Sequence, residues 1–189
     1  MCIRDSTGPL RGQLEYRYFH DQFDAGHFDN LYELDRARLD LGSGRVQAKD
    51  ARLAREADLS GVFGRATADV GQFVQAGAAY QYLAGGDEPK QEVRAEAELS
   101  PRALARVPRL RAARAYYQKN NIGARLNRAG TGDDGFFEST EDTFYGYALG
   151  LELAGEVTVV WDTRYVFARG ADGRLQRRKV LGIETVFFF

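Results

Sequence analysis

The last ten residues of the chain constrain its fold more than any other segment. They run from Val180 to Phe189 and read Val-Leu-Gly-Ile-Glu-Thr-Val-Phe-Phe-Phe. Side chains of a β-strand alternate between two faces, so one face of this segment carries Leu181, Ile183, Thr185, Phe187 and Phe189. The other face carries Gly182 and Glu184. Terminal residues of soluble proteins are usually loose and polar, so an apolar face that runs to the chain end is unusual for such a protein.

The two segments before it show the same alternation. Thr143 to Leu153 places Tyr145, Tyr147, Leu149, Leu151 and Leu153 on one face and Gly146, Ala148, Gly150 and Glu152 on the other. Glu156 to Ala168 places Val157, Val159, Trp161, Tyr165 and Phe167 opposite Thr158, Asp162 and Arg164. Ala154-Gly155 and Gly170 to Gly173 are turn signals. The three segments therefore predict an antiparallel meander with one apolar face and one small or polar face.

Weaker alternation continues upstream and brings the expected number of strands to about ten. The additional candidates lie at Leu14 to Tyr18, Ala37 to Leu41, Val62 to Ala68, Val74 to Tyr82 and Val93 to Leu99, with a further basic segment within Arg102 to Arg128. The stretch from Arg45 to Leu59 changes phase near Asp50, so it contains a bulge or is partly helical. Short turns at Gly42 to Gly44, Val70 to Gln72 and Ala154-Gly155 are expected on one side of the sheet. Longer connections, Asp21 to Asp29, Gly85 to Glu92 and Asn120 to Asp142, are expected on the other, with Ser100 to Pro108 as an exception.

Composition limits how such a chain could meet a membrane or a nucleic acid. The net charge is −1, which implies no bulk attraction to nucleic acid. Mean hydropathy is −0.44, and no run approaches the roughly 20 apolar residues of a membrane-spanning helix. Strands that cross a membrane need apolar residues only at alternate positions, so they leave a weak hydropathy signal.

Residue types are also sorted by height along the last three predicted strands. Aromatic residues mark both ends of the apolar face, and aliphatic residues fill the middle. The aromatic residues are Tyr145, Tyr147, Tyr165 and Phe167 at one rim and Phe187 and Phe189 at the other. Aromatic girdles around an aliphatic band suit the two interfaces of a bilayer. With its terminal aromatic residue, this pattern resembles the carboxyl-terminal part of a Gram-negative outer-membrane β-barrel.

The resemblance implies a fold, a location and a set of partners. The expected fold is all-β: an antiparallel up-and-down transmembrane β-barrel with about ten strands present and its N-terminal part truncated. The expected location is the cell outer membrane, with outer-membrane lipid and lipopolysaccharide as neighbours and no nucleic acid partner. The barrel-assembly machinery would recognise the final strand through Leu181, Ile183, Phe187 and Phe189.

The first six residues, Met1 to Ser6, resemble a translated sequencing adapter. They are therefore set apart, and residues 7–189 are expected to form the partial barrel. Met1 and Cys2 are the only Met and Cys in the chain. The remaining sequence thus offers no disulfide and no cysteine-ligated metal site.

Charged residues on the expected inner face are the candidates for a functional surface. They are Arg94, Glu96, Glu98, Glu152, Asp162, Arg164, Arg178 and Glu184. Such charges can tune the ion selectivity of a pore, or they can simply pair with one another. A basic run, Arg102 to Arg128, precedes an acidic run, Asp133 to Asp142. The acidic run could bind calcium, but it lacks the ligand spacing of an EF-hand and suits a solvated loop better.

No motif in the sequence indicates enzyme chemistry. The two histidines are His20 and His27, and His27 lies near Asp24 and Asp29. Neither lies near a serine in a recognisable hydrolase motif, and there is no phosphate-binding loop or metal-ligand spacing. The sequence therefore predicts no cofactor, no metal and no enzyme, and favours a passive, porin-like channel. The alternatives are a structural or export barrel that anchors a periplasmic domain, an outer-membrane hydrolase, and a soluble all-β domain.

Overall fold

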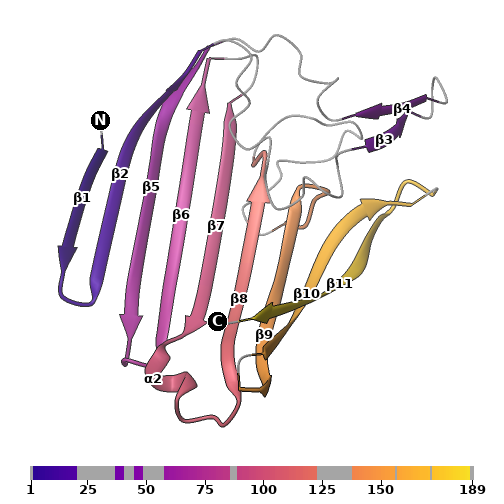
Figure 1. The fold of residues 1–189 in the computed structure, drawn as a ribbon. Coiled ribbons are helices and arrows are strands. Elements are labelled where there is room, and N and C mark those ends of the chain that lie inside the picture. The colour runs from indigo at the N-terminus through magenta and orange to yellow at the C-terminus, as the bar shows by residue number, and fades with distance from the viewer. Residues whose placement is uncertain are drawn as a thin grey trace.

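One antiparallel sheet dominates the computed structural model, which describes residues 2–20, 37–40, 45–48, 58–85, 89–122, 138–155, 157–170 and 172–187. In these residues the sheet contains nine strands in the order β1-β2-β5-β6-β7-β8-β9-β10-β11 (Figure 1). They are β1 (Cys2–Thr7), β2 (Leu10–Phe19), β5 (Leu59–Val70), β6 (Val74–Ala84), β7 (Lys90–Leu99), β8 (Leu110–Asn120), β9 (Thr143–Ala154), β10 (Val157–Arg169) and β11 (Leu175–Phe187). The predicted all-β, antiparallel, up-and-down arrangement is confirmed.

The predicted number of about ten strands is wrong. Within residues 7–189, the part expected to form the barrel, the described sheet has eight complete strands, β2 and β5 to β11. The ninth strand, β1, lies almost entirely within the first six residues. Two of the expected strands, β3 (Ala37–Asp40) and β4 (Arg45–Ala48), instead pair with each other in a separate sheet. Alternation reveals an extended conformation but cannot show which sheet a strand joins, and these two have only four residues each. The adapter origin of Met1 to Ser6 stays a prediction.

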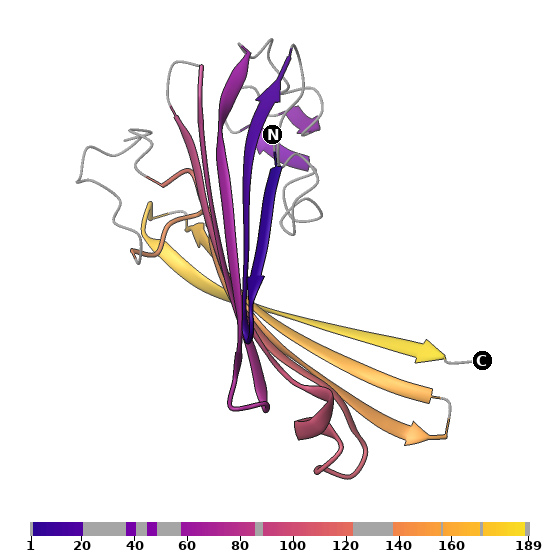
Figure 2. The same cartoon turned by 90° about the vertical axis from the view of Figure 1, so that its left-hand side faces the viewer.

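The sheet is strongly twisted, as Figure 2 shows most clearly for β8 to β11. Strands of a sheet twist with a fixed hand, and the twist accumulates from one strand to the next. β1 and β11 are the two edges of the sheet and do not pair with each other in the described residues. Closure into a barrel therefore stays a prediction.

The register continues each face of one strand into the same face of its neighbours across the sheet. Leu149, Trp161 and Ile183 are direct partners on β9, β10 and β11. On the opposite face, Arg65 of β5 and Arg94 of β7 both pair with Ala79 of β6. Direct partners in an antiparallel pair share a face. We call the face that carries Leu149, Trp161 and Ile183 the apolar face. We call the face that carries Arg65 and Arg94 the polar face.

The two ends of the sheet differ in their connections. At the turn end lie the tight turns at 8–9, 71–73 and 155, together with α2 (Pro101–Leu104) between β7 and β8 (Figure 1). The exceptional connection at Ser100 to Pro108 thus contains a short helix, for which Ser100 is the N-cap. The loop end carries the other connections. The predicted turn at Gly42 to Gly44 and the predicted loop at Asp21 to Asp29 lie outside the described residues. The predicted loops at Gly85 to Glu92 and Asn120 to Asp142 lie partly outside them.

No helix in the described part of the chain combines the length and apolarity needed to cross a membrane.

Candidate functional site

The apolar face of the sheet is exposed. Its described elements touch mainly through neighbouring strands, so the sheet is a single layer. Ile183 is 61% exposed and Leu153 60% exposed, and the other exposed apolar residues on this face include Leu10, Leu14, Tyr16, Tyr18, Val62, Tyr82, Tyr147, Leu149, Leu151, Leu181 and Phe187. A soluble antiparallel sheet buries its apolar face against a core. Large exposed apolar patches mark contact with a protein partner or a membrane.

On β8 to β10, the polar face is the more buried one. Phe144 is fully buried and Ala148 almost so. Next to them, the Tyr116 hydroxyl donates to Asp162 Oδ1 at 2.6 Å, and the Arg164 guanidinium lies 3.3 Å from Asp162 Oδ2. A carboxylate paired with a guanidinium and a hydroxyl is satisfied in a half-buried place, where an isolated charge would be costly.

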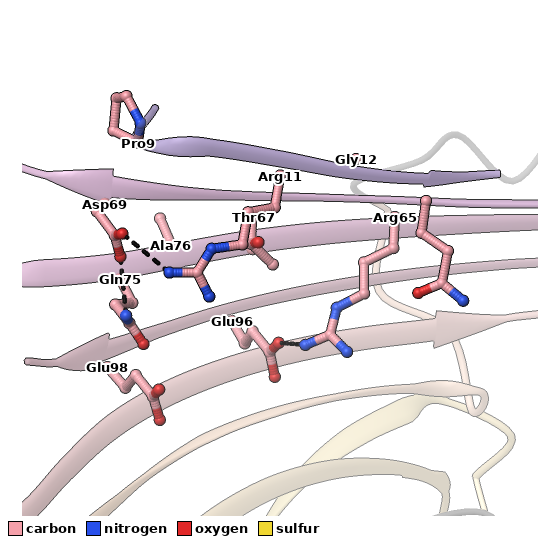
Figure 3. Close-up of a pocket in the computed structure, with 12 residues that line it drawn as sticks. Pro9, Arg11, Gly12, Arg65, Thr67, Asp69, Gln75, Ala76, Glu96 and Glu98 are labelled. Atoms are coloured by element: carbon pink, nitrogen blue, oxygen red, sulfur yellow. Dashed lines mark hydrogen bonds and ion pairs between the residues drawn. The ribbon is translucent and has the colours of Figure 1, made fainter. Parts of the chain in front are cut away.

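A charged hollow of about 750 Å³ lies on the polar face of β2, β5, β6 and β7 (Figure 3). Arg11 of β2 pairs with Asp69 of β5 at 3.3 Å, and Gln75 of β6 donates to the same carboxylate at 2.8 Å. Arg65 pairs with Glu96 across the hollow. Thus most of its charges are matched by an opposite charge on another strand of the sheet.

Glu98 is the exception in this hollow. It lines the hollow and is exposed, and no ion pair involves it among the described residues. Figure 3 shows its carboxylate lying apart from the Arg11–Asp69 and Arg65–Glu96 pairs. The hollow therefore carries one carboxylate that solutes and ions could meet directly.

Ion pairs continue along the polar face towards the loop end. Arg17 pairs with Glu15 at 2.9 Å, and its guanidinium lies 3.8 Å from the centroid of the Phe63 ring. Arg94 pairs with Glu92, which also accepts from Gln118 at 2.7 Å. The pattern is that of a polar, water-accessible surface whose charges balance one another locally.

The eight charges that the sequence predicts for an inner face lie on four different strands. Arg94, Glu96 and Glu98 lie on β7 beside the charged hollow, where Glu96 and Glu98 line it. Glu152 of β9 pairs with Arg111. The remaining four are on β10 and β11: Asp162, Arg164, Arg178 and Glu184. The register places all eight on the polar face, but the structure brings only Glu96 and Glu98 to the hollow.

Four residues of the hollow, Arg11, Arg65, Asp69 and Gln75, are missing from the sequence-based candidates. Arg65, Asp69 and Gln75 alternate with apolar neighbours in the sequence, so alternation alone could have found them. Arg11 precedes the expected start of its strand at Leu14, whereas β2 begins at Leu10.

Aromatic residues gather towards the loop end of the apolar face. Tyr145 stacks on Tyr165 with ring centroids 5.2 Å apart, and Phe167 lies 6.2 Å from Tyr145. Arg177 donates to the Tyr145 hydroxyl at 3.2 Å and lies over the Tyr165 ring. Tyr147 and Phe187 are exposed on the same face, the latter at the turn end, and Phe189 lies outside the described residues.

His20 lies beside an acid at the loop end, as a hydrolase would require. Its Nδ1 atom is 2.8 Å from Asp58 Oδ1, and the Tyr18 hydroxyl donates to Asp58 Oδ2 at 2.7 Å. The His20 side chain is 76% exposed. Catalytic pairs are usually held where water is restricted, so this exposure favours an ordinary surface cluster. His27, Asp133 and Asp134 lie outside the described residues, and the described part contains no group of side chains suited to a metal ion.

Comparisons of the chain with protein-family models, with curated proteins and with solved structures found no match.

Proposed function

We propose that this sheet is part of the wall of an outer-membrane β-barrel, with its apolar face against lipid. The exposed apolar residues on that face support the proposal, because lipid is a solvent in which they are stable. The eight strands β2 and β5 to β11 have 10 to 13 residues each. A membrane-crossing β-strand needs about 9–11 residues when tilted.

The sorting of side chains by height supports the same placement. Tyr145, Tyr165 and Phe167 cluster towards the loop end, Leu149 and Ile183 lie in the middle, and Phe187 lies at the turn end. Bilayer interfaces favour aromatic rings, and the hydrocarbon region favours aliphatic side chains. We propose outer-membrane lipid and lipopolysaccharide as neighbours, and recognition of Leu181, Ile183 and Phe187 by the barrel-assembly machinery.

We propose passive passage of small hydrophilic solutes along the polar face as the function. The observation that carries this proposal is the charged hollow, an open, polar space on the face opposite the proposed lipid contact. Its paired charges keep the surface hydrated without a strong net charge. Such a wall would sort solutes by size more than by charge, apart from the influence of Glu98.

Conductance across a planar lipid bilayer tests this function. The purified protein should produce stepwise currents, and Glu98→Gln should shift the reversal potential in a salt gradient towards anion preference. Asp172→Asn removes the same charge from an exposed turn at the loop end and should shift it less. A membrane with inserted protein but no current would refute the channel, and equal shifts for both variants would refute the role of Glu98.

A further inference from the structure

The connection between β7 and β8 carries a patch of arginines with no acid among them. The segment from Pro101 to Arg109 reads Pro-Arg-Ala-Leu-Ala-Arg-Val-Pro-Arg, and its three arginines, Arg102, Arg106 and Arg109, are all exposed. Arg102 donates to the Gln72 side chain, and Arg106 lies 4.5 Å from the centroid of the Phe73 ring. None of the three pairs with a carboxylate in the described part of the chain. We call these three arginines the basic turn.

The backbone holds the basic turn in place. Ser100 donates from its backbone N to Phe73 O at 2.8 Å and from its hydroxyl to Gln72 O at 2.6 Å, which ties the connection to the neighbouring β5–β6 turn. Arg109 O accepts from the backbone N of Glu152 at 2.7 Å. These bonds fix both ends of the segment to adjacent strands, so less entropy is lost when the arginines bind a partner.

Exposed apolar residues border the basic turn. Phe73 is 41% exposed, Val107 47% and Val70 57%. Val70 lies at the end of β5 on the apolar face, and α2 follows β7 at the same end of the sheet (Figure 1). A cationic patch next to the end of an apolar face suits the level of lipid headgroups, where guanidiniums stay hydrated and apolar groups reach the acyl chains.

We infer that the basic turn binds the phosphate groups of anionic phospholipids in the leaflet at the turn end. The inference rests on the proposed membrane placement of the apolar face. Guanidinium groups bind phosphate with two parallel hydrogen bonds, and three arginines without a carboxylate partner complement a negatively charged surface. Of the described acids at this end, Glu152 pairs with Arg111 and Asp69 pairs with Arg11, whereas Glu98 faces the charged hollow.

The association of spin-labelled lipids with the protein in phosphatidylcholine vesicles tests the inference. The fraction of immobilised label should show a preference of about fivefold or more for phosphatidylglycerol over phosphatidylcholine. Replacing Arg102, Arg106 and Arg109 with Gln should bring the preference close to one. The matched control replaces three loop-end arginines, Arg169, Arg174 and Arg177, with Gln and should retain most of it.

The outcomes separate this inference from the proposed function. Lack of insertion into any vesicle would refute the membrane placement itself. Insertion without a lipid preference would overturn the lipid inference alone. An equal loss of preference in the two triple variants would also overturn it, because net charge and not the basic turn would then be responsible.

Discussion

Gly61→Ala should destabilise the folded sheet by about 3 kcal/mol or more, in the range of severe single substitutions. A Cβ atom at Gly61 would lie 1.9 Å from Tyr82 O and 2.9 Å from Leu83 Cα on β6. Both are backbone atoms, so no side-chain rotation can relieve the overlap, and β5 and β6 would have to separate. Unfolding by urea in detergent micelles, followed by fluorescence of Trp161, would measure the loss.

Gly64→Ala on the same strand is the matched control. The closest atom to its added Cβ would be Leu14 Cδ1 at 4.0 Å, an ordinary contact. Alanine also restricts the unfolded chain more than glycine, so this variant should be as stable as the parent or more stable by up to about 1 kcal/mol. Equal stability of both variants would mean that β5 and β6 do not approach each other as described.

Leu149→Arg should lower the free energy of unfolding of the protein in a bilayer by about 2–4 kcal/mol. This is the penalty for an arginine on the lipid-facing side of a strand near the middle of the membrane. Leu149 is 41% exposed on the apolar face and lies beside Trp161 of β10. In a soluble sheet an exposed leucine could be replaced by arginine at little cost, because water would solvate the charge. Folding equilibria in phosphatidylcholine vesicles would measure the penalty.

Leu175→Arg provides the control at another depth. Leu175 pairs with Arg169 at the loop end of β11, on the same face of the sheet. Near a bilayer interface an arginine costs only about 0–1 kcal/mol. A small effect at both positions would contradict lipid contact, whereas a large effect at Leu149 alone would support it.

The sequence predicted the parts of the fold that depend on alternation. In β9, Tyr147, Leu149 and Leu151 are exposed, while Gly146, Ala148 and Gly150 on the opposite face are buried. The period of two survives in the sequence because each face has one environment along the strand. The turn at Ala154-Gly155 was also visible, since short turns have a local signature.

The parts that depend on distant partners could not be predicted. Whether β3 joins the main sheet depends on which strand it pairs with, and a short alternating segment does not specify its partner strand. The charged hollow brings together Arg11 and Asp69, which are 58 residues apart in the sequence. The contact of Tyr116 with Asp162 likewise depends on the order of β8, β9 and β10 in the sheet.

Quenching of Trp161 by brominated lipid tests the central claim, contact of the apolar face with lipid, most directly. Trp161 is the only tryptophan of the chain and sits between Leu149 and Ile183 on that face. In vesicles of phosphatidylcholine brominated in the acyl chains, its fluorescence should be strongly quenched. A Trp161→Phe, Val160→Trp variant moves the reporter to the polar face at nearly the same height and should be quenched much less. Equal quenching of both proteins, or stronger quenching at position 160, would contradict the account.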